Sequence, residues 1–341
     1  MAFRKLTVFL FNDLEPWERA CVEPILENLS QFAFIETIWV TEAQRRFFKK
    51  SHQGDFWIVS RHWRRAIDFL AAKNHRSGKL FISILNGVDE KKNLYELSFQ
   101  SFFAQFSKTT TLIVYSPLEY QFFREIKKVP ESQIKLGSLI RPKVEVSQSL
   151  NKISGQFQVG TFCDFSTESN IHFFLGVAHF ITKQNSQIHF NILGKGPLYG
   201  HFSKVINDLD LQDRVSIVET ISAATVGALD LFIYSPIRNH HFIPVLLAGA
   251  YGVPVVSVDI PGIENFIVPD KTGILVAASE IKAMGEKILQ LERESGKRKE
   301  LGEELKTHLK KTASVESLSQ RYQELFFEGG NSTEEEFRNV A

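Results

Sequence analysis

The sequence predicts an α/β protein with two Rossmann-like, doubly wound domains that face each other across a cleft. Two observations lead to this fold class. Apolar runs of strand length alternate with stretches of helical spacing, which is typical of parallel sheets covered on both faces. The runs also form two separate series, and 341 residues are enough for two domains that each bury a core.

Each series contains five runs that we expect to form strands. The first series comprises residues 6–11, 32–40, 55–60, 79–85 and 111–116. The second series comprises residues 156–162, 187–194, 214–219, 229–235 and 253–259. Most of these runs are continuously apolar rather than alternating, so we expect strands that are buried on both faces.

A polar segment around Pro142 separates the two series and predicts the domain boundary. A lysine- and glutamate-rich stretch near the C-terminus has the composition of a solvated amphipathic helix. The predicted division is a first domain (1–148), a second domain (149–313), a helix that returns to the first domain (314–328) and a flexible tail (329–341).

The composition is that of a soluble globular protein, with 43% hydrophobic and 23% charged residues. The 30 phenylalanines are expected to fill cores. Cys21 and Cys163 are the only cysteines and lie far apart, which predicts a reducing compartment without a disulfide framework or zinc site. The first apolar run is too short for a signal peptide, and no stretch approaches the ~20 apolar residues of a membrane span. We therefore expect a cytoplasmic protein.

The net charge of +1 conceals an uneven distribution. Residues 1–150 contain 22 basic and 16 acidic residues, whereas residues 151–341 contain 18 and 23. A basic first half suits an anionic acceptor or peripheral contact with anionic lipid at the inner face of the membrane, although ordinary solvated surface explains it too. Residues 41–50 combine paired aromatics with four basic residues, a composition that suits membrane adhesion. No recognition motif for nucleic acid accompanies them, so we expect no nucleic acid partner.

Several segments of the second half occur in an informative order. They are VGTF (159–162), NILGKGPL (191–198), LQDRVSIVE (211–219), GAYGVPVVSVDIPGIENFI (249–267), DKTGILV (270–276) and SVESLSQRYQELFF (314–327). Together they resemble the nucleotide-sugar domain of the family 4 (group 1) glycosyltransferases, which have the two-domain GT-B architecture. The likeness extends from Phe157 to about Phe327. The first half matches more faintly, and residues 111–137 resemble the family's strand, helix and return strand before the hinge.

The resemblance implies transfer of a sugar, with retention, from a nucleotide-diphosphate sugar to a glycan, lipid or protein acceptor. The donor would be a co-substrate, and neither a further cofactor nor a metal is expected. An alternative is a catalytically inactive GT-B pseudoenzyme that acts as a binding or assembly partner. Positions that normally carry the donor-site chemistry motivate this alternative, because several of them have changed.

The turn that opens the second domain is one changed position. By resemblance, Gly160 and Thr161 lie at the donor diphosphate, and Thr161 stands where the family has a basic residue. A second basic residue is expected within 164–170, which contains no Lys or Arg. Charge for the leaving diphosphate would then have to come from elsewhere.

The glycine turn Gly194–Lys195–Gly196 is a second candidate for contact with the diphosphate. Its glycines suit positive φ or close approach of a ligand, and a purely structural turn explains them as well. Lys195 and Arg238 are the nearest residues to supply replacement charge.

A helix expected over residues 243–250 would point its N-terminus at the diphosphate, with Phe242 and Ile243 at its start. Asn239 and Leu247 stand where the family usually has two glutamates. Asn239 can still hydrogen-bond a sugar hydroxyl, whereas Leu247 can offer the ribose no polar group.

The remaining candidates are histidines and one glutamate. His240 and His241 replace small, glycine-containing positions, and they either bind an anion or act as acid–base groups, or fill a site no longer used. His62, within a basic cluster at a predicted strand end, is the candidate on the acceptor side, although a solvated helix start explains the cluster equally well. His62 and Asn239 are thus the catalytic candidates. Glu264 lies farther along and could approach the ribose, although a helix-capping or surface role is the favoured expectation.

Overall fold

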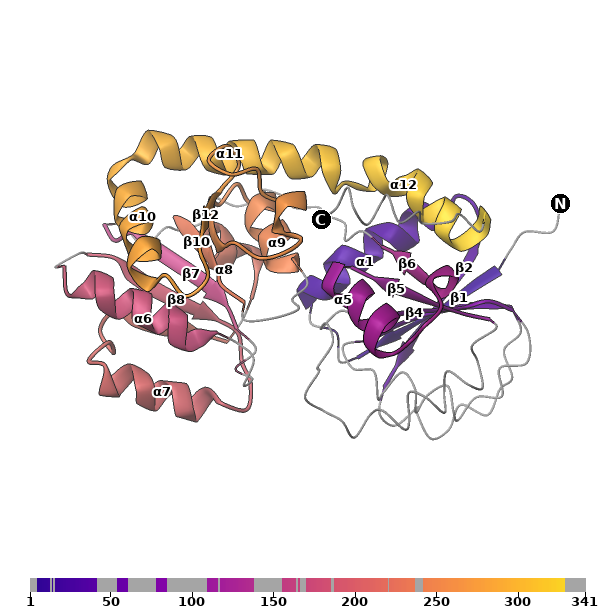
Figure 1. Cartoon of the computed structure of the whole chain (residues 1–341), viewed down its shortest axis with the longest axis horizontal. Helices are drawn as coiled ribbons and strands as arrows, with labels where there is room; N and C mark the ends of the chain where they lie inside the picture. Colours follow the sequence, from indigo (N-terminus) through magenta and orange to yellow (C-terminus); the bar gives the residue numbers. More distant parts are fainter. Residues whose placement is uncertain are drawn as a thin grey trace. The chain divides into compact units, whose positions relative to one another are not determined.

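The computed structural model describes residues 5–12, 14, 16–41, 54–60, 78–84, 109–115, 117–137, 155–163, 165, 170–184, 187–219, 221–236 and 242–328. These residues divide into two compact α/β units, each built on a six-stranded parallel sheet (Figure 1). The predicted fold class, two doubly wound α/β domains in one chain, is confirmed.

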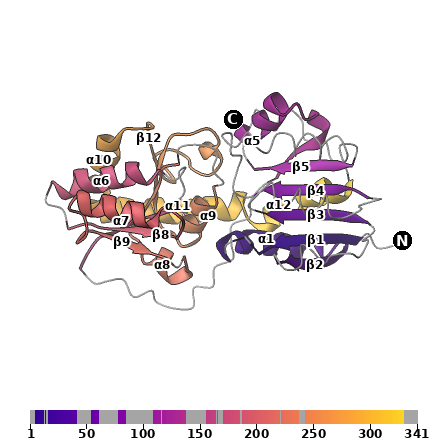
Figure 2. The same ribbon diagram turned by 90° about the horizontal axis from the view of Figure 1, so that it is seen from below.

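The sheet of the first unit has the strand order β2-β1-β3-β4-β5-β6, and neighbouring strands are parallel (Figure 2). Its strands are β1 (Lys5–Phe11), β2 (Phe34–Val40), β3 (Asp55–Ser60), β4 (Leu80–Ile84), β5 (Thr110–Val114) and β6 (Ile134–Leu136). The order is that of a doubly wound sheet, because the chain moves outward from β1 in both directions.

The described helices of the first unit come from both ends of the chain. They are α1 (Pro16–Leu29), α5 (Pro117–Gln121) with a π-helical turn (Phe122–Ile126), a 3₁₀ turn (Glu131–Gln133), and α12 (Val315–Gln323) with a second π-helical turn (Glu324–Glu328). Helix α12 packs against α1, where the Ser319 hydroxyl donates to Asn28 Oδ1 at 3.0 Å. The described residues from Val315 onward therefore belong to the first unit.

Side chains on both faces of the first sheet are buried. One face carries Phe9 and Phe56, which meet edge to face at 5.3 Å, together with Phe122 and Phe123 from the π-helical turn. On the other face, the Phe326 ring lies 4.8 Å from Trp57 and 4.7 Å from Phe81.

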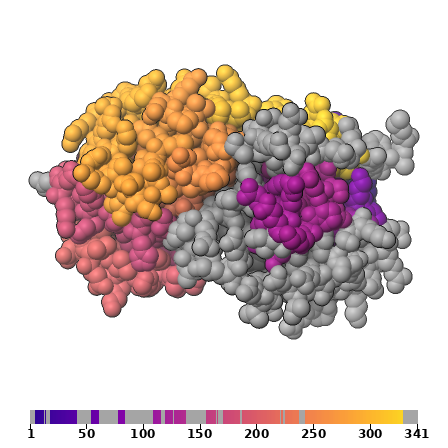
Figure 3. Space-filling view, in the orientation of Figure 1, coloured from indigo at the N-terminus to yellow at the C-terminus, as the bar shows by residue number. Residues whose placement is uncertain are grey.

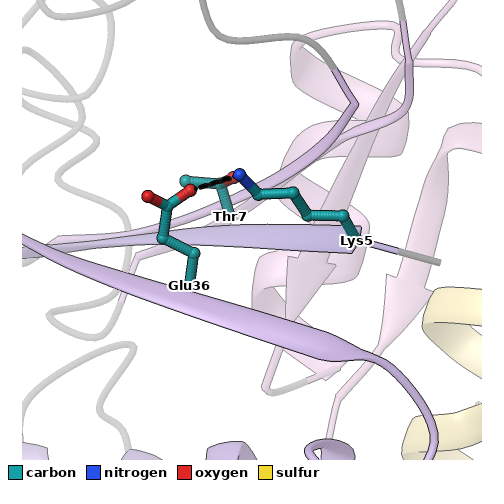
Figure 4. A network of polar contacts seen from close by, with 3 residues as sticks. All are labelled: Lys5, Thr7 and Glu36. Atoms are coloured by element: carbon teal, nitrogen blue, oxygen red, sulfur yellow. Dashed lines mark hydrogen bonds and ion pairs between the residues drawn. The ribbon is translucent and has the colours of Figure 1, made fainter. Parts of the chain in front are cut away.

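The exposed hydrophobic side chains described in this unit lie on the outer strand β2 or in the turn before it. Phe34 is 60% exposed, and Phe32 and Trp39 are each 39% exposed. Lys5 Nζ lies 2.7 Å from Glu36 Oε2, which also accepts a 3.3 Å hydrogen bond from the Thr7 hydroxyl (Figure 4). Both members of this ion pair are more than one-third exposed, so it adds little to stability.

The sheet of the second unit has the strand order β12-β11-β10-β7-β8-β9. Its strands are β7 (Gln158–Phe162), β8 (His189–Leu193), β9 (Val215–Val218), β10 (Leu231–Tyr234), β11 (Val255–Val258) and β12 (Ile274–Val276). All are paired in parallel, so their carboxyl ends meet at one edge of the sheet.

Helices cover both faces of the second sheet. They are α6 (Ile171–Thr182), α7 (Tyr199–Asp208), α8 (Ala223–Gly227), α9 (Ile243–Ala250), a 3₁₀ turn (Ile263–Asn265), α10 (Ile281–Arg293) and α11 (Ser295–Thr312). Helices α6, α7 and α10 share one apolar core with the sheet, whereas α9 packs against α11. The gold surface in Figure 3 comes from this C-terminal part of the unit.

The ten apolar runs correspond to ten of the twelve strands, with bounds that differ by at most two residues. Strands β6 and β12 have three residues each, too few to produce a run. The family resemblance had already indicated a return strand near β6.

Both cysteines are free and buried. None of the described helices is long and apolar enough to cross a membrane.

Candidate functional site

The topology of the second sheet indicates where a ligand site lies. Strands β7, β8 and β10 end at Phe162, Leu193 and Tyr234. The chain runs from β7 toward β9 on one side and from β10 toward β12 on the other, so the strand order reverses between β10 and β7. Doubly wound sheets bind ligands beyond the carboxyl ends of the strands at such a reversal. The loops after these strands therefore form the candidate site.

Gly194 allows the ends of β7 and β8 to approach each other closely. Its φ is +142°, a value that favours glycine, and a Cβ atom there would overlap the Cys163 carbonyl oxygen. The Gly194 N–H donates to Val218 O at 2.8 Å, and the Cys163 N–H donates to Leu193 O at 3.0 Å. The close backbone contact between the loops after β7 and β8 thus explains why residue 194 is a glycine.

Lys195 and Gly196 complete the turn that leads into α7. Lys195 is exposed, and the Gly196 carbonyl accepts a 3.3 Å hydrogen bond from the Tyr199 N–H. Lys195 is therefore available at the carboxyl edge of the sheet, as the sequence suggested.

Gly160 and Thr161 have structural explanations. A Cβ atom at Gly160 would lie 2.5 Å from Leu229 Cδ1, so packing against that leucine requires glycine. Thr161 is 6% exposed and pairs with Ile192 across the sheet. Its side chain presents little surface to a ligand, and it carries no charge to neutralise a diphosphate.

Helix α9 begins at the same edge with an uncapped first turn. Its N-cap residue, Phe242, makes no side-chain capping hydrogen bond. The Phe242 ring packs instead at 4.7 Å from Phe266 and 6.0 Å from Tyr234. Free N–H groups in a first helical turn attract phosphate without any particular side chain. Phe242 and Ile243, both predicted at the donor, thus contribute backbone amides rather than polar side chains.

Leu247 lies one turn into α9 and is 6% exposed. The opposite packing of this helix is tight, since a Cβ atom at Gly249 would collide with Leu309 and Leu305 of α11. Position 247 thus carries a leucine instead of a carboxylate, in a helix that is packed tightly against α11. The side chain of Leu247 cannot hydrogen-bond a ribose.

The other predicted site residues lie outside the described residues. They are His62, Arg238, Asn239, His240 and His241. Their roles stay predictions.

Glu264 has the local role expected from the sequence. Its Oε1 atom accepts a 3.1 Å hydrogen bond from the Gly262 N–H, and Gly262 has a φ of +91°. The Asn265 side-chain amide donates to Gly262 O at 3.1 Å. The carboxylate therefore stabilises the turn after β11.

Two aromatic residues at this edge were missed by the sequence reasoning. Phe165 follows β7 with a φ of +45°, and Tyr199 begins α7 with 43% of its surface exposed. Their ring centroids are 5.9 Å apart. The available signal was an aromatic residue soon after the run 156–162 and another just after the glycine turn.

The described part of the site contains little ionisable chemistry. Burial raises the pKa of the Tyr234 phenol, so this residue stays neutral at the end of β10. Among the residues that the structure describes, no group of three or more His, Cys, Asp and Glu is placed to hold a metal ion. What this part of the edge offers a ligand is backbone amides, an exposed lysine and an exposed aromatic ring.

Comparison with known families adds an independent finding. A model of the family described as "Glycosyl transferases group 1" matches residues 143–308. This segment contains β7 to β11, the glycine turn and α9, which together frame the candidate site.

One curated relative is the poly(ribitol-phosphate) alpha-N-acetylglucosaminyltransferase of Staphylococcus aureus (strain COL). It is 25% identical over 171 residues, which is 49% of this chain and 35% of the relative. The chain thus spans about a third of the length of that relative.

Solved structures share the fold at low sequence identity. TarM from S. aureus has a TM-score of 0.67 and 19% identity, over 80% of this chain and 54% of TarM. HepE from Anabaena, in complex with UDP and glucose, has a TM-score of 0.69 and 13% identity, over 94% and 98%. Sucrose-phosphate synthase from Thermosynechococcus elongatus has a TM-score of 0.68 and 12% identity, over 95% and 99%.

Proposed function

We propose that this glycosyltransferase-like protein moves a sugar from a nucleotide-diphosphate donor to an acceptor hydroxyl. The proposal starts from the match of residues 143–308 to the group 1 glycosyltransferase family. The bond from the sugar C1 to the diphosphate oxygen breaks, and a bond from C1 to the acceptor oxygen forms with retention. The nucleoside diphosphate leaves, and its phosphate oxygen takes up the proton that the acceptor hydroxyl loses. UDP-sugars are the first donors to test, because related folds such as HepE are known in complex with UDP.

The carboxyl edge of the second sheet carries this proposal. The uncapped first turn of α9 and the Gly194–Gly196 turn both follow strands that end there. Preorganised N–H groups aimed at a leaving diphosphate stabilise the charge that develops on it. We assign the diphosphate to these two backbone segments, with Lys195 and Arg238 as the candidates for a positive charge. Asn239 remains the candidate for the sugar, and His62 for the acceptor side.

The acceptor belongs to the first unit in this proposal. Residues 1–150 carry a net charge of +6, which favours an anionic acceptor or lipid headgroups. The relative from S. aureus is named for a polymer of ribitol phosphate, an acceptor of this chemical class. Exposed Phe34 and Trp39, with the Arg19 guanidinium 4.6 Å over the Trp39 ring, support peripheral contact with an anionic surface.

A thermal-shift titration with UDP, GDP and ADP tests donor binding. A ligand specific for the native state adds RT ln(1 + [L]/Kd) to stability, or about 2.7 kcal/mol at 100 times Kd. We expect a shift with at least one nucleotide, reduced in Lys195→Ala or Arg238→Ala. Lys204→Ala, which removes an exposed lysine from the body of α7, is the matched control. The absence of a shift with every millimolar nucleotide would contradict the proposal.

A second assay separates transfer from binding alone. The protein is incubated with the UDP-sugar that gives the largest shift, and release of UDP is measured with and without poly(ribitol phosphate). Release that depends on the acceptor supports a transferase. Nucleotide binding with no turnover on neutral or anionic acceptors would favour the inactive pseudoenzyme alternative.

A further inference from the structure

The proposed function leaves open which side chain receives the base of the nucleotide donor, and one exposed ring lies where a base would be needed. Tyr199 is 43% exposed, and among the described Phe, Tyr and Trp side chains of the second unit it is the exposed one. It begins α7, three residues after the Gly194–Gly196 turn. The ring is therefore presented at the carboxyl edge of the sheet.

The ring of Tyr199 packs against the ring of Phe165, which in turn packs against that of Phe202. Phe165 is fully buried and Phe202 is 2% exposed. The Phe165 ring lies 5.9 Å from Tyr199 and 5.9 Å from Phe202. Tyr199 is thus the exposed member of an ordered group of three rings rather than an isolated surface residue.

The backbone around Phe165 is held in an unusual conformation. Its φ of +45° is uncommon for an aromatic residue, and such a conformation persists only where the surroundings enforce it. The Phe165 N–H donates to Cys163 Sγ at 3.0 Å, and its carbonyl accepts from the Leu198 N–H at 3.0 Å. These bonds join the loop after β7 to the turn after β8. In this conformation the centroid of the Phe165 ring lies 5.9 Å from that of the Tyr199 ring.

We infer that the ring of Tyr199 is the stacking surface for the nucleobase of the donor. A nucleobase is planar, and stacking on an aromatic side chain needs no base-specific hydrogen bond. The Gly194–Gly196 turn then faces the diphosphate of the same ligand, on the N-terminal side of Tyr199. This assignment rests on the proposed function, because it names the base subsite of that donor.

His201 provides a matched control in the same helical turn. Its ring lies 5.9 Å from His172 of α6 and 5.1 Å from Phe202, so it faces α6 and makes no described ring contact with Phe165. Replacing His201 with Gln changes an exposed aromatic ring two residues from Tyr199. It leaves the three-ring group intact.

The test is calorimetric titration with two probes: the nucleotide that best stabilises the wild-type protein among UDP, GDP and ADP, and inorganic pyrophosphate. In Tyr199→Ala we expect nucleotide affinity to fall about tenfold, the order expected for loss of one base–aromatic stack. Pyrophosphate affinity should stay within twofold. Tyr199→Phe, which keeps the ring, and His201→Gln should both bind the nucleotide like the wild type.

Three results would overturn the inference. Unchanged nucleotide affinity in Tyr199→Ala would show that the ring does not contact the base. An equal loss for nucleotide and pyrophosphate would show that the substitution damages the phosphate site or the fold. Equal losses in Tyr199→Ala and His201→Gln would indicate a general effect of the first turn of α7. Failure of the wild-type protein to bind any nucleotide would instead refute the proposed function, and the inference with it.

Discussion

The two units hold the carboxyl edges of their sheets together by different means. In the first unit, side chains form a buried hydrogen-bond network: the Trp57 indole N–H and the Tyr115 hydroxyl both donate to Ser83 Oγ, at 2.8 and 3.0 Å. In the second unit, backbone contact at Gly194 and the rings around Phe165 do this work. The difference teaches that the second edge is ordered by main-chain contacts while Lys195, in the turn after Gly194, stays exposed, which suits recognition of a phosphate.

The polar network of the first unit extends into α5. The Tyr115 N–H donates to Glu119 Oε2 at 2.6 Å, and burial raises the pKa of the Tyr115 phenol. Tyr115 is thus a neutral donor at physiological pH. A network whose members are buried fixes strand ends, but it offers a ligand few groups.

Gly194→Ala should have the largest effect on stability, because it disrupts the backbone contact between the loops after β7 and β8. The added Cβ would overlap the Cys163 carbonyl, and the residue would have to keep a φ of +142°. We expect a loss of about 3 kcal/mol in the free energy of unfolding, measured by urea denaturation, together with loss of nucleotide binding.

Gly200→Ala is the matched control for that change. Gly200 lies in α7, and a Cβ atom there meets nothing within 4 Å. Alanine in a helix should stabilise by up to about 1 kcal/mol. Equal effects of the two substitutions would contradict the role given to the Gly194–Cys163 contact.

Ser83→Ala probes the first edge and should have an intermediate effect. Removing the hydroxyl leaves the Trp57 and Tyr115 donors buried without their acceptor, which costs about 2 kcal/mol in unfolding free energy. Tyr115→Phe removes one donor and keeps the Trp57–Ser83 bond, so its cost should be smaller, about 1 kcal/mol. Urea denaturation measures both. Nucleotide affinity should not change in either variant, and a large change would contradict the separation of roles between the units.

The smallest effect concerns pH and the amino ends of the second sheet. Burial, assisted by the charge of Arg214, lowers the pKa of His189, whose Nε2 lies 2.8 Å from Ser216 Oγ. The unfolded chain then binds a proton at a higher pH than the folded chain does. Stability should therefore fall as pH decreases through about 6.5, the ordinary value for histidine, toward the lower folded pKa.

Urea midpoints at pH 7.5 and 5.5 measure this dependence. His189→Gln should reduce the difference between the two midpoints. Burial also lowers the pKa of His308, so a second replacement there should reduce the difference further. An unchanged difference in the double variant would show that these two histidines do not determine the acid sensitivity.

Much of the fold could be predicted because each long strand is a continuous apolar run, as in DFWIVS (55–60). The glycine turn and the helix from Ile243 could be located from the residues alone or by resemblance. The sequence does not show why particular positions require the residue that they carry. Gly160 is required by Leu229, and Gly194 by the Cys163 carbonyl, and both are contacts between segments distant in sequence.

The Phe165–Tyr199 pair was missed for a related reason. Its meaning depends on a positive φ at Phe165 and on hydrogen bonds to Cys163 and Leu198, neither of which a local pattern reveals. Leu247 illustrates the opposite case. The sequence showed that no carboxylate stands there, and the structure adds that the side chain is buried in a tightly packed helix.

The central claim is that the carboxyl edge of the second sheet binds a nucleotide largely through main-chain amides. Hydrogen–deuterium exchange with and without saturating UDP tests it directly. The account predicts slower exchange in residues 194–199 and 242–246, with no comparable change in residues 110–137 of the first unit. Protection confined to the first unit, or none at the edge of the second sheet under conditions where UDP is bound, would contradict it.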